Sequence, residues 1–224
     1  MSAQGPLRDR EPAGFGLIET LRSEPEAGFV RLDRHLARLS SSAAELGFAF
    51  DRGKIEAALA GAVRGAKTPL RVRLLLSKDG TVDAAAQPVG PLAAGTVWTL
   101  RLARATLRSR DRLLRHKTTR RETYAKARAE YPASQAEEVL LANERGEVCE
   151  GAITTLFADF GDGPLLTPHL DCGLLAGVLR AEMLDEGRAR QAVLTLDDLT
   201  AAKALFVGNS LRGLIAARLA RSPS

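Results

Sequence analysis

Lys117 carries the most distinctive chemistry in this sequence. It lies in a short stretch, residues 115–121, in which every other permanent cation is an arginine. A lysine amine condenses with an aldehyde to form an imine, whereas a guanidinium does not. The alternative is a solvated lysine in a basic loop, because runs of charge usually face water. Other motifs in the sequence are needed to distinguish an imine-forming lysine from a solvated one.

Length and composition bound the class of protein. With 224 residues, 45% hydrophobic and 26% charged, the sequence is typical of a soluble globular protein with a sizeable core. It has no apolar run long enough to span a membrane, and residues 1–6 lack the build of a secretory signal. Cys149 and Cys172 provide neither a disulfide framework nor a zinc pattern. The sequence therefore predicts a cytoplasmic protein with no metal site and no membrane partner.

The net charge of +5 is concentrated in one run, Arg101–Arg121, whose only acidic residue is Asp111. This run could bind a phosphate backbone or line a pocket for a small polyanion. Its richness in arginine could also simply reflect genomic composition. Nucleic-acid binders gather cations on one face and often interleave aromatic residues, but aromatic residues are 4% here. The composition thus disfavours a nucleic-acid partner, although a non-catalytic binding module acting through this run is a separate hypothesis.

Periodicity and turn residues predict a mixed α/β protein in two subdomains. A loose tail is expected over residues 1–14, a small α/β subdomain over 15–105, a connector over 106–116, and a larger subdomain carrying Lys117 over 117–224. In the small subdomain we expect strands over 15–21, 29–32, 70–77, 81–87 and 96–103, and helices over 33–46 and 51–63. Asp33 is the expected N-cap of the first helix and Gly47 its end.

The larger subdomain is predicted to begin with a helix. Its expected helices cover 121–130 and 176–186, and its expected strands cover 138–142, the residues leading to 150, 154–159, 192–195 and 204–207. Asn143–Gly146 and Gly161–Gly163 are the expected turns between strands.

Four stretches, in this order, resemble the class IV aminotransferase family, whose members use pyridoxal 5′-phosphate (PLP). They are Leu32–Leu39 (LDRHLARL), His116–Thr119 (HKTT), Cys149–Phe157 (CEGAITTLF) and Leu175–Arg180 (LAGVLR). The likeness extends over residues 15–218. It implies fold type IV, a two-subdomain mixed α/β fold like that of D-amino-acid aminotransferase, and a small-molecule substrate. It also implies a homodimer, because family members complete each active site with a loop from the partner subunit.

The resemblance also implies roles for single residues. Lys117 would hold PLP as an imine and, once released by substrate, would move protons. Glu150 would be the carboxylate that keeps the ring nitrogen protonated, without which the ring is a poor electron sink. Arg38 matches the family's phosphate-binding arginine. The alternatives are an exposed glutamate at a strand end and a solvated helix arginine.

Two further segments match the family's contacts to the cofactor phosphate. Gly177, Val178 and Leu179 stand at the start of a predicted helix, where unpaired N–H groups and the macrodipole favour an anion. Asn209 and Ser210 match the second phosphate-binding loop. A plain helix start is the alternative for the first segment.

Within the family, Lys117-Thr118-Thr119 and Asn209-Ser210-Leu211 most resemble the 4-amino-4-deoxychorismate lyases, which release pyruvate to leave 4-aminobenzoate, a folate precursor. On that interpretation Thr20 could relay a proton, and Arg212 and Thr155 would lie on the substrate side. The alternative is an aminotransferase acting on a branched-chain, D-amino acid or amine substrate. The tyrosine that transaminases carry five residues after the lysine is absent. Tyr124 follows at seven, which leaves open the residue at the phenolic oxygen of PLP.

Overall fold

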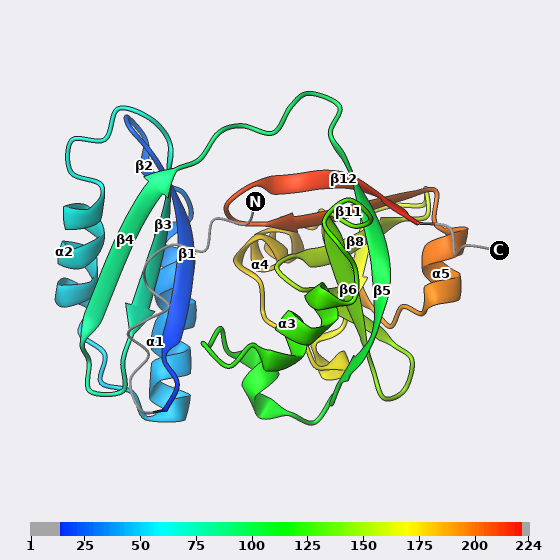
Figure 1. Cartoon of the computed structure of the whole chain (residues 1–224), viewed down its shortest axis with the longest axis horizontal. Helices are drawn as coiled ribbons and strands as arrows, with labels where there is room; N and C mark the ends of the chain where they lie inside the picture. Colours follow the sequence, from blue (N-terminus) through cyan, green and yellow to red (C-terminus); the bar gives the residue numbers. More distant parts are fainter. Residues whose placement is uncertain (1–13, 221–224) are drawn as a thin grey trace. The chain divides into compact units, whose positions relative to one another are not determined.

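The computed structural model describes residues 14–220, which divide into two units (Figure 1). The first consists of the chain up to Gly90 together with His116–Arg120, and the second of Pro91–Arg115 and the chain from Arg121 onward. The predicted tail over 1–14 lies outside the described residues except for Gly14. Among the described residues, no helix is both long and apolar enough to cross a membrane.

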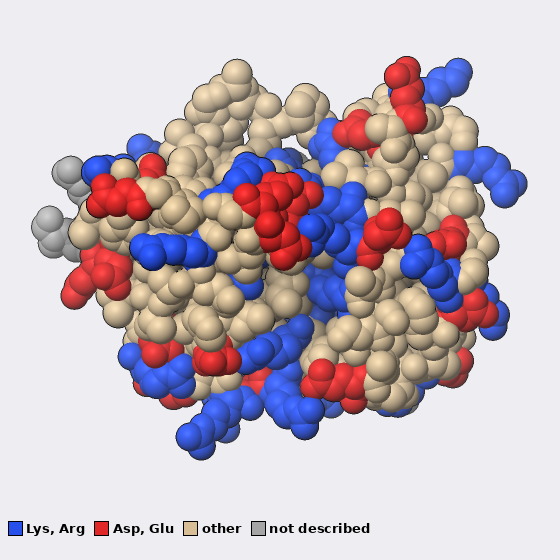
Figure 2. All heavy atoms as spheres, turned by 180° about the vertical axis from the view of Figure 1, so that it is seen from behind, with Lys and Arg blue, Asp and Glu red and all other residues tan. Residues whose placement is uncertain are grey.

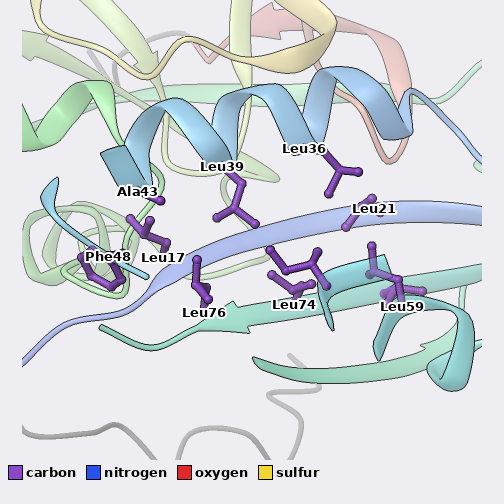
Figure 3. Close-up of a cluster of buried hydrophobic side chains, with 11 residues drawn as sticks. Leu17, Leu21, Leu36, Leu39, Ala43, Phe48, Leu59, Leu74 and Leu76 are labelled. Atoms are coloured by element: carbon purple, nitrogen blue, oxygen red, sulfur yellow. The ribbon is translucent and has the colours of Figure 1, made fainter. Parts of the chain in front are cut away.

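The first unit is a four-stranded antiparallel sheet in the order β2-β1-β3-β4, with two helices. Its elements are β1 (Leu17–Glu24), β2 (Gly28–Phe29), α1 (Leu32–Leu46), α2 (Arg52–Ala62), β3 (Leu70–Leu76) and β4 (Val82–Pro88). Both helices share one core with alternate residues of β1 and β3, so they cover the same face of the sheet. Figure 3 shows the leucines of α1 lying over β1.

Helix α1 forms because apolar residues recur at helical spacing. Leu36, Leu39 and Ala43 are buried against the sheet. Gly47 ends the helix in the left-handed conformation, as expected, with a φ of 68°. The predicted N-cap is wrong: the helix begins at Leu32, and its N-cap is Arg31 at a φ of 58°, without a side-chain cap. Asp33 instead lies in the first turn, where its charge suits the helix dipole.

The second unit is an eight-stranded mixed sheet in the order β10-β9-β8-β11-β12-β5-β6-β7. Its strands are β5 (Val97–Leu107), β6 (Glu138–Asn143), β7 (Val148–Gly151), β8 (Thr155–Asp159), β9 (Leu165–Pro168), β10 (Ala189–Ala192), β11 (Ala204–Asn209) and β12 (Gly213–Leu219). Its helices are η2 (Arg112–Arg115), α3 (Glu122–Ala129), η3 (Leu170–Cys172), α4 (Val178–Asp185) and α5 (Leu196–Ala201). Strand β5 pairs in parallel with both β6 and β12.

The structure corrects the boundaries of the predicted subdomains. Strand β5, expected to close the small subdomain at residue 105, belongs to the second sheet, because Leu100 packs in one core with Leu140 and Ile215. The predicted connector over 106–116 contains the end of β5 and the helix η2. Lys117 groups with the first unit rather than the larger one.

Two strands and one α-helix of the second unit were not predicted: β9, β12 and α5. The strand expected over 192–195 is misplaced, because β10 ends at Ala192. Thr195 is instead the N-cap of α5, in a capping box with Asp198. These elements are four to seven residues long, too short to show a clear period.

Candidate active site

The segment that carries Lys117 is bound to β1 of the first unit. Ile18 N–H donates to the Lys117 carbonyl at 2.8 Å, and Thr119 N–H donates to the Gly16 carbonyl at 2.9 Å. Thr118 forms an antiparallel bridge with Leu17. Strand β2 pairs only with the far end of β1, at Ser23 and Glu24. The lysine segment therefore takes the part of the β1 edge that β2 does not cover.

Helix α1 holds the same segment through His116. The side chain of His116 is buried, and its Nδ1 lies 2.9 Å from the Ser42 hydroxyl. Its Nε2 lies 3.6 Å from a carboxylate oxygen of Glu45. Backbone pairing on one side and this contact on the other leave Lys117 partly buried in a segment with little freedom to move.

Arg38, the predicted phosphate ligand, forms an ion pair with Glu19. The guanidinium donates to both carboxylate oxygens, from Nε at 2.8 Å and from Nη2 at 2.5 Å, and His35 Nδ1 lies 2.7 Å from Oε2. Burial alone would raise the pKa of Glu19, but Arg38 and His35 outweigh it and lower the pKa to about 2. Thr20 follows Glu19 on β1, so its side chain faces the opposite side of the sheet and lies outside this cluster.

Glu150, the predicted ring-nitrogen partner, lies on β7 in the second unit and is 5% exposed. Its Oε1 accepts a hydrogen bond from the Tyr124 hydroxyl at 2.6 Å and one from Leu175 N–H at 3.3 Å. Tyr124 comes from α3, and the guanidinium of Arg121 lies over its ring, 4.4 Å from the centroid. The carboxylate is thus buried within a set of donors.

The start of α4 gathers several predicted residues. Gly177 is its N-cap, and no side chain among the described residues caps it. A Cβ on Gly177 would come within 2.7 Å of Thr155 Oγ1, and one on Gly208 within 2.8 Å of Leu179 Cδ2. Thr155 and Gly208 are also register partners in the sheet. The backbone and side chains are therefore so close at the start of α4 that only glycine fits at positions 177 and 208. The residues that meet there are Thr155, Gly177, Leu179 and Gly208.

The predicted second phosphate loop lies between β11 and β12. Its Asn209 side chain organises the loop, because its Oδ1 accepts from Leu211 N–H and Arg212 N–H at 3.1 Å each. Its Nδ2 donates to the Ile153 carbonyl at 3.3 Å, which ties the loop to the turn after β7. Ser210 is buried, and Arg212 is half-buried.

Arg180 was missed as a site residue, although it belongs to the motif that identified the helix start. It is 3% exposed, and its Nη2 donates to the Pro168 carbonyl and to Gln191 Oε1. Its Nε is buried and has no hydrogen-bond partner among the described residues. Burial lowers the pKa of Arg180 to about 10, although nearby Glu150 opposes the shift. A buried cation with an unused donor in the first turn of α4 suits an anion.

A second missed residue, Glu138, holds the turn between β7 and β8. The carboxylate is fully buried and accepts from Ala152 N–H, Ile153 N–H and the Thr154 hydroxyl. Burial raises its pKa. A Cβ on Gly151 would lie 2.8 Å from this carboxylate, so glycine is required there. The signal was available in the sequence: a glutamate that begins a strand and is followed by four apolar residues.

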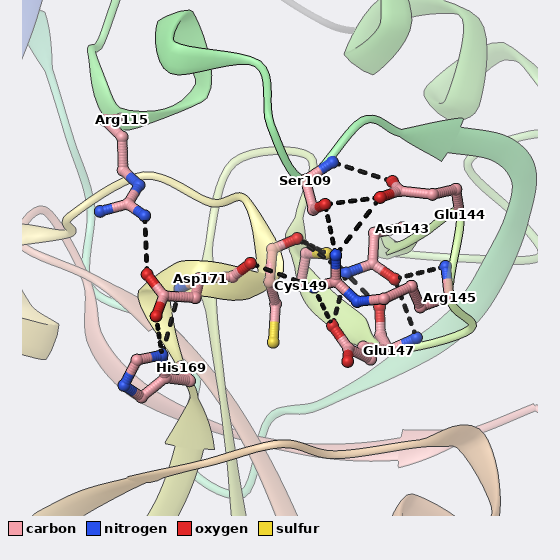
Figure 4. Close-up of polar contacts among 10 residues, drawn as sticks. Ser109, Arg115, Asn143, Glu144, Arg145, Glu147, Cys149, His169 and Asp171 are labelled. Atoms are coloured by element: carbon pink, nitrogen blue, oxygen red, sulfur yellow. Dashed lines mark hydrogen bonds and ion pairs between the residues drawn. The ribbon is translucent and has the colours of Figure 1, made fainter.

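A polar network surrounds the turn before β7 (Figure 4). Arg145 donates to the carboxylate of Glu147, and the Asn143 amide donates to Glu147 and to the Cys172 carbonyl. Cys149 and Cys172 are both buried free thiols, and burial raises the pKa of each. A raised pKa lowers the fraction of each thiol that is present as the nucleophilic thiolate. Among the described residues, no group of three or more His, Cys, Asp or Glu could hold a metal ion.

The arginine run is partly occupied within the protein. Arg115 pairs with Asp171, Arg120 lies over the Phe15 ring, and Arg121 donates to the Ala152 carbonyl. On the face drawn in Figure 2, basic side chains lie beside acidic ones.

Comparison with known proteins adds to this geometry. The family model for amino-transferase class IV matches residues 16–220. A crystal structure from Mesorhizobium loti, described as a "Putative amino-acid aminotransferase", is 63% identical, covers 92% of this chain and 100% of that chain, and has a TM-score of 0.91.

Two more distant relatives carry a different name. A protein of Schizosaccharomyces pombe described as a "Putative aminodeoxychorismate lyase" is 30% identical over 187 residues, which are 81% of this chain and 80% of that protein. The structure of 4-amino-4-deoxychorismate lyase from Pseudomonas aeruginosa has a TM-score of 0.76 at 24% identity. It covers 91% of this chain and 82% of that chain, and it shows a shared fold.

Proposed function

Because the chain belongs to the class IV aminotransferase family and has its fold type IV architecture, we propose that it is a PLP-dependent aminotransferase that acts on an amino acid. The observation that carries this proposal is the 63% identity to the Mesorhizobium loti protein across the whole of that chain. The comparisons favour the aminotransferase over the lyase that the sequence motifs resemble. The two lyase relatives described above are 30% and 24% identical to this chain, against 63% for the aminotransferase.

The family implies PLP, and three observations in the second unit fit its phosphate group. The start of α4 carries no side-chain cap, Gly177 and Gly208 leave no space for a Cβ, and Arg180 has a buried donor without a partner. In the second unit, the phosphate would bind to the amides of Val178 and Leu179 and to Asn209 and Ser210. Arg38, in the first unit, is the arginine that the resemblance assigns to the phosphate. The ion pair with Glu19 supports this role for Arg38, because it holds the guanidinium in one orientation.

In this proposal Lys117 and Glu150 are the two catalytic residues. PLP, when bound, supplies an electron sink for the substrate carbon that carries the amino group. Lys117 would hold the cofactor covalently between turnovers, and its Nζ would then take and return a proton at that substrate carbon. Glu150 would keep the ring nitrogen protonated by staying ionised beside it. The anchored segment around Lys117 supports this role, because proton transfer requires a well-positioned amine.

We place Thr155 and Arg212 on the substrate side. Arg212 would bind a substrate carboxylate, since a planar guanidinium can do so with two hydrogen bonds. We also propose a homodimer, as the family resemblance implies. Sedimentation of active protein tests this point, and a fully active monomer would exclude a shared active site.

The lyase is the second candidate, and a specific sequence feature favours it. Asn209-Ser210-Leu211 and Lys117-Thr118-Thr119 resemble the lyases, and the Schizosaccharomyces pombe relative carries that name. In this case Thr20 would relay a proton, and the products would be pyruvate and 4-aminobenzoate.

One assay separates the two candidates. An aminotransferase passes the amino group to the cofactor, so a single amino acid bleaches the visible absorbance of the enzyme until a keto acid restores it. A lyase needs no second substrate and keeps its absorbance. We expect an amino acid to bleach the band and aminodeoxychorismate to release little pyruvate. Rapid pyruvate release from aminodeoxychorismate without added keto acid would instead establish the lyase.

A further inference from the structure

Tyr124 lies in the first turn of α3 and directs its hydroxyl at Glu150. The O–H donor reaches Glu150 Oε1 at 2.6 Å, a separation typical of a hydrogen bond to a charged acceptor. Leu175 N–H donates to the same oxygen at 3.3 Å. The phenol is therefore occupied by the carboxylate.

The aromatic ring of Tyr124 is held from several sides. It packs against the buried cluster that contains Cys149 and Ala152. The Arg121 guanidinium lies 4.4 Å from the ring centroid and also donates to the Ala152 carbonyl, which follows β7. The same cation thus holds both the ring and the strand end that carries Glu150. These contacts fix the direction in which the hydroxyl donates.

We propose that Tyr124 is a positioning residue that holds the Glu150 carboxylate ionised and oriented, and that it does not contact the phenolic oxygen of the cofactor. The inference rests on the proposed function, in which Glu150 must be negative to keep the ring nitrogen protonated. A hydrogen bond donated to the charged form of a carboxyl favours that form. Loss of the donor leaves a buried carboxylate with less support, and such a group tends to take up a proton.

The charges around the pair agree with this role. Burial raises the pKa of Tyr124 far above its ordinary value, and the Glu150 carboxylate raises it further, whereas Arg121 opposes the shift and Cys149 adds to it. Tyr124 therefore remains a donor wherever the enzyme is folded. The charge of Arg180 also interacts with Glu150.

The first test uses the protein without cofactor. We would measure thermal unfolding of Tyr124→Phe, Glu150→Ala and their double variant. The matched control is Tyr131→Phe, alone and combined with Glu150→Ala. Tyr131 is the only other tyrosine and donates to the Leu102 carbonyl at 2.9 Å. If the bond exists, the Tm losses of Tyr124→Phe and Glu150→Ala, which removes the acceptor, are not additive, whereas those of Tyr131→Phe and Glu150→Ala add. Additive losses for the first pair would overturn the inference.

The second test uses the cofactor-loaded enzyme. Tyr124→Phe should lower kcat about ten-fold or more, as expected for loss of one hydrogen bond to a charged group, with KM little changed. It should also shift the pH midpoint of the visible band, while Tyr131→Phe changes neither quantity. A merely structural tyrosine would not move the band.

The two proposals fail in different ways. If Glu150→Gln is nearly inactive while Tyr124→Phe behaves like the wild type, the inference is wrong and the role of Glu150 stands. If Glu150→Gln itself turns over like the wild type, the proposed function of Glu150 is wrong.

Discussion

Glu19 and Arg38 form a doubly hydrogen-bonded ion pair inside the first unit, with Nε to Oε1 at 2.8 Å and Nη2 to Oε2 at 2.5 Å. Glu19 is 2% exposed, so the pair is shielded from solvent. Arg38 was predicted to be a cofactor ligand by resemblance alone, and Glu19 was not predicted to have a role. A buried pair of this kind orients the arginine and makes its position depend on the charge of the glutamate.

This pair predicts an acid-sensitive fold. The pKa of Glu19 is about 2 when folded, against 4.5 for an unperturbed glutamate. A lowered pKa stabilises the fold above the unfolded value, and the benefit disappears as the pH falls from about 4.5 to about 2. We expect the free energy of unfolding to drop by about 3 kcal/mol more across that window in the wild type than in Glu19→Gln. Denaturant unfolding at a series of pH values measures this, and parallel curves for the two proteins would contradict it.

Replacing Ser42 tests how strongly helix α1 holds the segment that carries Lys117. Ser42→Ala removes the partner of buried His116 and should cost about 1 kcal/mol, or about 2–4 °C in Tm. Ser41→Ala is the matched control, because its neighbouring side chain on the same helix is exposed and should change Tm little. Hydrogen exchange should also speed up at the amide of Thr119 in Ser42→Ala alone. Equal effects of the two variants would show that α1 does not hold this segment.

Gly177 predicts a steric limit at the start of α4. In Gly177→Ala the new methyl would meet Thr155 Oγ1 at 2.7 Å, although the φ of −64° suits alanine. We expect weaker PLP binding, measured by equilibrium dialysis, because the helix start must shift. Gly61→Ala, in open space within α2, should leave binding unchanged and stabilise the helix by about 1 kcal/mol. Unaltered PLP affinity in Gly177→Ala would place the phosphate elsewhere.

Much of the architecture could be predicted from sequence patterns, whereas the candidate site residues were assigned by resemblance and remain predictions. The helices α1 and α2 lie where the sequence patterns predict them, within one or two residues at each end. Glu150, Gly177 and Asn209 could be assigned by resemblance because the residues of each motif are contiguous, and their roles stay predictions. Partners that come from distant segments were not found: Glu19 for Arg38, and Tyr124 for Glu150. Strand β5 was assigned to the wrong unit because a strand's own sequence does not reveal which neighbours it pairs with.

Replacing Glu138 tests whether its carboxylate stabilises the turn that follows Glu150. Glu138→Gln replaces an acceptor-only group with one that also donates, and three of its contacts are donors on the turn after β7. We expect a lower Tm and faster hydrogen exchange at Ala152 and Ile153. Glu137→Gln, on the exposed neighbour, should leave exchange at these two amides unchanged. Wild-type exchange in Glu138→Gln would mean that backbone pairing alone holds the turn.

Borohydride reduction of the PLP-loaded protein, followed by tryptic peptide mapping, tests the central claim most directly. The account predicts a pyridoxyl group on Lys117, within the peptide from His116 to Arg120 that cleavage at the flanking arginines releases. The variant Lys117→Ala should bind PLP without the visible band and should give no labelled peptide. A label on Lys126 or Lys203, or an unlabelled wild-type protein that remains active, would contradict the assignment of Lys117.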